Sequence, residues 1–269
     1  MQPVPDLIYD AGMHRGEDTA FYLAKGYRVV AFEANAALVA ACRERFAPEI
    51  EQGRLTIIEG AISDSGEPTI TFYEHPNTVW GTIALDAQNE RFAELSTAVE
   101  VAVVNLPQVL REHGMPAFMK IDIEGADTIC LRALAEFEQR PPFLSVEAPG
   151  EKPALEEQLS ILDSLGYKRF AVVQQATVSR TPLHTVTLDG EPLSFSFEEG
   201  ASGPFGEEVG PWVSRDAAVR RYRRVFLGYR LLGRDGPIRR TRLGRGLLGQ
   251  AAARTQIPMP GWFDTHARL

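Results

Sequence analysis

The first 175 residues alternate short apolar runs of β-type residues with stretches of helical periodicity. Such alternation is typical of a parallel sheet, because a helix must carry the chain back before the next parallel strand can start. The pattern therefore predicts an α/β fold with a mostly parallel central sheet and helices on both faces. The expected strands are residues 7–9, 28–32, 55–58, 118–123, 143–147 and 167–173, and the expected helices are residues 17–25, 36–46, 127–137 and 154–165.

Two parts of the chain depart from this alternation. Residues 63–115 contain β-like runs at 69–73 and 99–103, which indicate an inserted hairpin or additional edge strands. The later part of the chain is rich in Gly, Pro and Ser, as loops are, and a basic helical pattern then covers 215–232. The boundaries that we expect are a domain at residues 1–175 and an irregular, partly helical C-terminal extension at residues 176–269, packed on that domain.

Charge is distributed unevenly along the chain, whose formal net charge is −8. From Arg215 onward the sequence has 13 Arg, no Lys and three acidic residues, whereas the first 214 residues carry a net charge of −18. The Arg-rich helix could dock on an anionic lipid, a nucleic acid or a phosphorylated substrate, but packing against the acidic remainder of the chain is the favoured interpretation. Because the sequence has no recognisable nucleic-acid-binding module, we expect no nucleic-acid partner.

Composition and cysteine usage are those of an ordinary globular protein, with 44% hydrophobic residues. No run of about 18 apolar residues occurs, so no integral membrane association is expected. The N-terminus lacks the basic and apolar regions of a signal peptide. Cys42 and Cys130 lie in apolar helical patterns, which predicts buried, reduced thiols in a cytoplasmic protein. Because the sequence shows no Cys/His spacing typical of a metal site, we expect no metal. The sequence leaves open whether the protein forms a homo-oligomer.

The loop after the first expected strand, residues 10–19, contains two glycines four positions apart. Gly12 and Gly16 allow a tight turn and let the backbone approach a ligand closely. The spacing differs from the dinucleotide-binding pattern G-x-G-x-x-G, because Met13 and His14 stand where its second glycine would be. Taken alone, this loop is as compatible with a structural turn as with a cofactor site.

Acidic and small residues follow the next two expected strands. Glu33 ends the second strand, and its carboxylate could accept both hydrogen bonds of a ribose diol. This acidic residue lies 17 positions beyond Gly16, and the two features together are much stronger than either alone. After the third strand, Ala61 and Ile62 could flank an adenine ring.

Charged residues alternate along the fourth expected strand, where Lys120, Asp122 and Glu124 stand between apolar residues. A central strand is normally apolar on both faces, so charges at these positions are costly. One explanation is a structural network of salt bridges. The other, which we favour, places the charged residues at the carboxyl edge of the sheet, facing a cofactor and a substrate.

Three segments together resemble the FkbM family of class I methyltransferases. They are residues 10–19, Val-Val-Ala-Phe-Glu-Ala-Asn at 29–35 and Lys-Ile-Asp-Ile-Glu-Gly-Ala-Asp at 120–127, and the third is the most specific. The resemblance covers about Asp6 to Val173. It implies the Rossmann-like fold of class I methyltransferases, S-adenosylmethionine as donor, and O-methylation of a hydroxyl on a sugar, polyketide or related metabolite. The chain departs from the commoner family form, which has Ala-Asn where Met13-His14 stand.

The resemblance also implies roles for individual residues. Asp10, Gly12 and Gly16 would hold the methionine part of S-adenosylmethionine. Glu33 would bind its ribose, and Asp122 would lie beside the methyl-bearing end. The cofactor-binding residues that we expect are Asp10, Ala11, Gly12, Gly16, Asp18, Thr19, Glu33, Ala34, Asn35, Ala61, Ile62 and Asp122.

Methyl transfer to a hydroxyl requires alignment of three atoms and a base for the hydroxyl proton. Asp122 suits binding better than catalysis, because a carboxylate beside a sulfonium stabilises charge that disappears in the transition state. Among the histidines, His14, His75 and His266 are equal candidates for a catalytic role. The catalytic candidates by position are Asp122, Glu124, Glu147 and His75.

Two other functions compete with methyl transfer to a small-molecule or glycan acceptor. An NAD-dependent oxidoreductase also places an acidic residue after its second strand, but the spacing of the glycine loop disfavours this class. A non-catalytic module could retain a cofactor pocket without chemistry. The residues whose joint presence argues against such a module are Asp10, Gly12, Gly16, Glu33 and Asp122.

Overall fold

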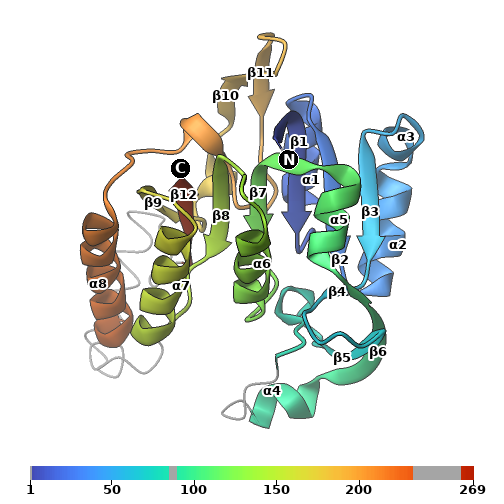
Figure 1. Cartoon of the computed structure of the whole chain (residues 1–269), viewed down its shortest axis with the longest axis horizontal. Coiled ribbons are helices and arrows are strands. Elements are labelled where there is room, and N and C mark those ends of the chain that lie inside the picture. The colour runs from blue at the N-terminus through green and yellow to red at the C-terminus, as the bar shows by residue number, and fades with distance from the viewer. Residues whose placement is uncertain (1, 85–89, 233–261) are drawn as a thin grey trace.

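The computed structural model describes residues 2–84, 90–232 and 262–269. The strands of its central sheet are β1 (Pro3–Ala11), β2 (Arg28–Glu33), β3 (Leu55–Glu59), β7 (Met115–Ile121), β8 (Phe143–Glu147), β9 (Arg169–Gln174) and β12 (Phe263–Arg268). Their order is β3-β2-β1-β7-β8-β12-β9 (Figure 1). The pairs from β3 to β8 are parallel, and β12 runs antiparallel to both of its neighbours. The predicted α/β fold with a mostly parallel sheet is therefore confirmed.

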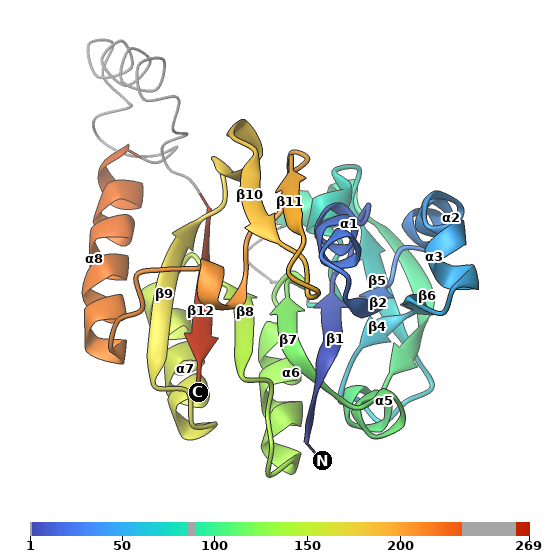
Figure 2. The same cartoon turned by 90° about the horizontal axis from the view of Figure 1, so that it is seen from above.

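Helices lie on both faces of this sheet (Figure 2). They are α1 (Glu17–Ala24), α2 (Ala36–Arg45), α3 (Ala47–Glu51), α5 (Leu106–His113), α6 (Asp127–Ala133), α7 (Lys152–Ser164) and α8 (Arg215–Leu232). Short 3-10 helices are η1 (Thr78–Trp80), η2 (Leu134–Glu136), η3 (Val178–Arg180) and η4 (Gly206–Glu208). Because the strands from β3 to β8 are parallel, their carboxyl ends all lie at one edge of the sheet.

The two faces of the sheet belong to two apolar cores. Successive residues of a strand point to opposite faces, so Tyr9 belongs to the core that α5, α6, α7 and α8 cover, whereas Ile8 belongs to the core that α1 and α2 cover. Both residues are fully buried. The free thiol of Cys130 lies in the first core and that of Cys42 in the second, so both are buried as expected.

The C-terminal extension completes the second of these cores. Its hairpin consists of β10 (Leu183–Val186) and β11 (Pro192–Phe195), in a region where the sequence indicated only loops. Beyond the hairpin, the ring of Phe205 stacks on Phe118 of β7 with centroids 4.6 Å apart. The ring of Phe197 meets Phe21 of α1 edge-on at 4.7 Å. Aromatic residues of the extension therefore cover part of the face that α1 and α2 leave open.

The last described segment supplies a strand that the sequence analysis did not predict. Strand β12 lies between β8 and β9, although its sequence had been assigned to the C-terminal extension. Its buried residues include Asp264, Thr265 and His266, so the segment lacks the apolar run that marks the other central strands. Its position in the sheet is decided by pairing with two distant strands, which local sequence does not show.

The insertion between the third and fourth expected strands forms a small sheet of its own. Its strands are β4 (Ala61–Ile62), β5 (Thr69–Glu74) and β6 (Thr97–Val104), in the order β4-β6-β5. Strands β5 and β6 pair antiparallel, as an inserted hairpin would. Helix α4 (Glu90–Leu95) lies between them in the chain. The insertion thus stands beside the central sheet instead of extending its edge.

Helix α8 has the bounds that the sequence indicated. Ala218 and Tyr222 are buried in the core that α8 shares with α7, so apolar contacts hold the helix on the domain. Arg220, Arg223 and Arg224 are exposed. None of these three arginines forms a salt bridge with another described residue. Residues 233–261 of the predicted extension lie outside the described residues. Within residues 2–84, 90–232 and 262–269, no helix is both long and apolar enough to cross a bilayer.

His266 is an unusual member of the central sheet. It is 2% exposed, and its Nε2 has no hydrogen-bond partner among the described residues. Burial lowers the pKa of His266 from 6.5 to about 3. Below about pH 6.5 the unfolded chain therefore binds a proton that the folded protein does not bind. The contribution of His266 to stability is complete above pH 6.5 and is lost as the pH falls toward 3.

We expect His266→Leu to remove this dependence on pH. Between pH 7 and pH 5, the wild-type protein should lose about 2 kcal/mol more free energy of unfolding than the variant. Urea unfolding at both pH values measures the difference, and comparison with the variant cancels the contributions of all other titrating groups. Equal losses in the two proteins would contradict a neutral, buried His266.

Candidate functional site

A cavity of about 640 Å³ lies at the carboxyl edge of the central sheet. Residues at or directly after the carboxyl ends of β1, β2, β3, β7 and β8 all contribute to its lining. Open parallel sheets bind their ligands at this edge, because the loops there are free to vary while the strands hold them in place. The cavity is therefore the first candidate for a functional site.

The loop after β1 passes close to the end of β7. Gly12 has a φ of +84°, and a Cβ atom at this position would lie 1.8 Å from the carbonyl oxygen of Asp122. Gly16 has a φ of +82°, and its Cβ would lie 2.3 Å from the ring of Phe46. Gly12 lines the cavity and Gly16 does not. Both glycines are thus required by the path of the loop itself, apart from any role with a ligand.

Lys120 is the centre of a buried network of charges below this loop. Its Nζ lies 3.4 Å from Asp10, 3.5 Å from Asp122 and 3.7 Å from Asp18. It also donates to the carbonyl oxygen of Gly12 at 2.9 Å. Burial alone would lower the pKa of Lys120, but these three carboxylates, together with that of Asp264, raise it well above its usual value. A structural salt-bridge network, one of the two interpretations of the charged strand, is present.

Some of the residues predicted to bind a cofactor are buried beside the cavity and do not line it. Asp10 is fully buried, accepts a hydrogen bond from the Thr19 hydroxyl at 2.6 Å, and does not line the cavity. Ala11 and Thr19 are likewise buried and outside the lining. Asp18 lines the cavity and accepts the backbone N–H of Ser202 at 2.9 Å. Asp18 thereby links the loop to the C-terminal extension.

Glu33, at the end of β2, presents a carboxylate to the cavity. Its Oε2 accepts the backbone N–H of His14 and its Oε1 that of Asn35, each at 2.9 Å. Burial raises the pKa of Glu33, and these two hydrogen bonds oppose the rise. Each oxygen keeps a lone pair for a further donor, so the carboxylate can accept two hydroxyl groups. Ala34 also lines the cavity, whereas the Asn35 side chain caps α2.

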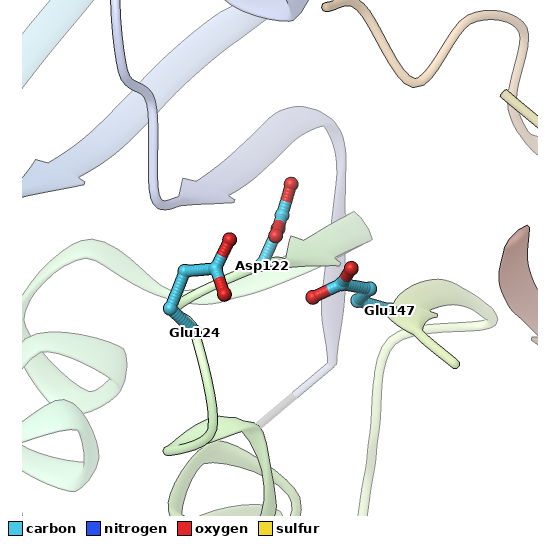
Figure 3. Close-up of side chains that lie close together, drawn as sticks. All are labelled: Asp122, Glu124 and Glu147. Carbon is cyan, nitrogen blue, oxygen red and sulfur yellow. The ribbon is translucent and has the colours of Figure 1, made fainter. Parts of the chain in front are cut away.

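Three carboxylates meet at the far side of the cavity. Asp122 and Glu124 follow β7, and Glu147 ends β8; carboxylate oxygens of the three lie within 4.8 Å of one another (Figure 3). Burial and the neighbouring carboxylates raise the pKa of Glu124 to about 8 and that of Glu147 to about 10. Such a group can share protons or hold a cation with oxygen ligands. A search for Cys/His spacing could not have detected it.

The structure separates His75 and His266 from these residues. The ring of His75 stacks on Phe92 at 4.9 Å, its Nδ1 accepts the Asn77 N–H, and His75 does not line the cavity. His266 lies in the middle of β12 and also has no place in the lining. His14, by contrast, lines the cavity.

The lining includes residues that the sequence analysis did not assign to the site. Thr78, Trp80 and Ile83 come from the insertion, while Gly200 and Trp262 come from the C-terminal extension. Ala61 and Ile62, which were expected beside an adenine, line the same cavity. The missed residues share no motif, since they come from the two parts of the chain outside the α/β alternation.

We expect Lys120→Met to destabilise the fold strongly, because Asp10 and Asp18 would remain buried without their counter-charge. The loss should be about 3–5 kcal/mol at neutral pH, measured by urea unfolding. Lys168→Met is the matched control: its partner Asp163 lies at 2.9 Å on the exposed surface, and the same change there should cost less than about 1 kcal/mol. Similar losses at the two positions would contradict the central role of Lys120.

Comparison with solved structures gives distant similarities. A precorrin-6Y C5,15-methyltransferase from Geobacter metallireducens is 12% identical, over 73% of this chain and 77% of that chain, with a TM-score of 0.38. An O-methyltransferase from Bacillus cereus, solved with S-adenosylhomocysteine, is 12% identical over 70% of this chain and 71% of its own, with a TM-score of 0.36. Similarities this weak do not transfer a function.

Comparison with protein families is more specific. No curated protein sequence matches the chain. The model of the methyltransferase FkbM domain matches residues 10–169, which is more than half of the chain. The match begins near the end of β1 and includes Glu33 at the end of β2, Asp122 directly after β7 and Glu147 at the end of β8. The chain belongs to the FkbM methyltransferase family.

Proposed function

We propose that the protein transfers a methyl group from S-adenosylmethionine to a hydroxyl group of a small metabolite or glycan. The observation that supports this most directly is the presence of two different acidic sites in one cavity. Glu33 offers a carboxylate with free acceptor capacity at the end of β2, and Glu124 and Glu147 offer carboxyl groups of raised pKa beyond β7 and β8. The first suits a ribose, and the second suits an acceptor hydroxyl.

The lining residues divide between the two ligands by their chemistry. Glu33 would accept the two ribose hydroxyls, and the apolar side chains of Ala61 and Ile62 would flank the adenine. Gly12, with no side chain, would let the methionine part approach the backbone of the loop. Asp122, held by Lys120 at 3.5 Å, would orient the charged end of the donor.

Proton removal is the task of this chain in the chemical step. When bound, S-adenosylmethionine supplies a methyl carbon on a positively charged sulfur. The acceptor oxygen would bond to that carbon as the carbon–sulfur bond breaks, with S-adenosylhomocysteine as the leaving group. Glu124 or Glu147 in its ionised form takes the hydroxyl proton. Their raised pKa values make them stronger bases than an ordinary carboxylate, and a positioned base contributes a factor of about 10²–10⁴.

Replacement of Glu33 tests the donor site. We expect Glu33→Ala to weaken binding of S-adenosylhomocysteine at least about tenfold, because charge-assisted hydrogen bonds of about 1.5–3 kcal/mol are lost. Isothermal titration calorimetry measures the affinity. The control is Glu59→Ala, since Glu59 ends the adjacent strand β3 but points to the surface, where it pairs with Arg43 at 2.8 Å.

Two calorimetric results, one with NAD and one with S-adenosylhomocysteine, would overturn the proposal. One is tight binding of NAD by the wild-type protein with no response to S-adenosylhomocysteine, which would favour an oxidoreductase. The other is unchanged affinity for S-adenosylhomocysteine in a folded Glu33→Ala protein, which would remove Glu33 from the site. A protein that binds the cofactor but methylates no compound in a panel of hydroxylated metabolites and glycans would fit a non-catalytic module.

The pH dependence tests the base. Once product mass spectrometry identifies an acceptor, kcat/KM should rise about tenfold per pH unit below pH 8 and level off above it, because Glu124 must lose its proton and its pKa is about 8. Glu124→Gln should reduce kcat by about 10²–10⁴ and flatten this rise. Loss of activity in Glu147→Gln with full activity in Glu124→Gln would assign the base to Glu147 instead.

A further inference from the structure

One wall of the cavity comes from the insertion and is joined to the rest of the site by hydrogen bonds of its own. We call residues 77–83, between β5 and α4, the wall segment; Thr78, Trp80 and Ile83 of this segment line the cavity. The wall segment belongs to neither apolar core of the central sheet. Apart from a backbone bridge between Thr82 and Tyr73 of β5, its position over the cavity therefore depends on a small number of side-chain contacts.

Two hydroxyl groups attach the wall segment to the rest of the site. The Thr82 hydroxyl donates to the carbonyl oxygen of Glu124 at 2.6 Å, and Glu124 has a φ of +46°. The Thr78 hydroxyl lies 2.8 Å from Nε2 of His14, in the loop after β1. One end of the wall is thus attached to the residues at the acceptor side, and the other to the loop at the donor side.

His14 is held from three directions. Its backbone N–H donates to Glu33 at 2.9 Å, its Nδ1 lies 3.0 Å from a carboxylate oxygen of Glu17, and its Nε2 meets Thr78. Its φ of +50° is a left-handed conformation, which residues other than glycine adopt uncommonly. The contacts on both sides of the residue maintain this conformation.

The partners of the ring fix its orientation. A carboxylate only accepts hydrogen bonds, so Nδ1 carries the hydrogen that points to Glu17. Nε2 of a neutral ring then accepts the hydrogen of the Thr78 hydroxyl. If the ring gains a second proton, Nε2 donates and the same hydroxyl accepts, since a hydroxyl can do either. The contact between His14 and Thr78 therefore persists in both states of the ring.

We propose that His14 is a positioning residue that couples occupancy of the donor site to the position of the acceptor wall. A ligand on Glu33 acts on the carboxylate that holds the main chain of His14. The ring of His14 then holds Thr78, and with it the wall segment, over the three carboxylates. The coupling rests on the proposed place of S-adenosylmethionine at Glu33, whereas the attachment of Thr78 to His14 does not.

Hydrogen exchange of the unliganded protein tests the attachment. In Thr78→Val, which removes the hydroxyl and keeps the branched side chain, amides of residues 75–84 should exchange about fivefold faster, the factor that one net hydrogen bond contributes to a local opening equilibrium. Thr78→Ser keeps the hydroxyl and should exchange at the wild-type rate. Strands β5 and β6 provide internal reference peptides. Equal exchange in Thr78→Val and the wild-type protein would overturn the attachment.

A second variant separates the ring from the backbone. His14→Asn keeps a residue that tolerates the left-handed conformation, but its side chain is shorter than that of histidine. It should accelerate exchange in residues 75–84 as much as Thr78→Val does. The double variant should be no faster than either single one, because both remove the same contact. Additive acceleration would show two independent effects and would contradict the pairing.

S-adenosylhomocysteine is the probe for the coupling. In the wild-type protein and in Thr78→Ser, it should slow exchange in residues 75–84 several-fold. In Thr78→Val, a saturating concentration of the same ligand should give no such protection. Equal protection in Thr78→Val would overturn the coupling. Absence of binding to the wild-type protein would instead overturn the proposed donor, while the unliganded measurements would still decide the attachment.

Discussion

The buried ammonium group of Lys120 connects the parts of the molecule that form the site. It holds Asp10 at the end of β1, Asp18 in α1 and Asp122 beyond β7. Through Asp18, which accepts backbone N–H groups of Ser202 and Gly203, the network continues into the C-terminal extension. Buried charges persist only when each has a partner, so this one side chain constrains three elements at once.

The same network explains why the acidic residues of the cavity differ in character. Asp122 lies beside Lys120, and Glu124 and Glu147 form no salt bridge with any residue of the described chain. Burial and neighbouring negative charge therefore raise the pKa values of these two residues, to about 8 and about 10. Among these three residues, one carboxylate is suited to holding positive charge and two are suited to exchanging a proton near neutral or alkaline pH.

The walls of the cavity come from parts of the chain that lie outside the repeating α/β pattern. The insertion contributes Thr78 and Trp80, and the C-terminal extension contributes Gly200 and Trp262. Variation in such segments changes what a cavity accepts without changing the sheet that supports it. We therefore expect the acceptor to be selected by these walls, and the donor by the loops of the sheet.

Local sequence determined much of this architecture, because the periodicity of apolar residues and the strand-end positions of Glu33, Asp122 and Glu147 depend only on nearby residues. The helix at 215–232 and the paired runs at 69–73 and 99–103 were found in the same way. Tertiary structure alone decided the place of β12, whose polar residues join the sheet through β8 and β9. It also excluded His75 from the cavity and brought His14 to Thr78, 64 positions away. Contacts between residues so far apart leave no periodic signal in the sequence.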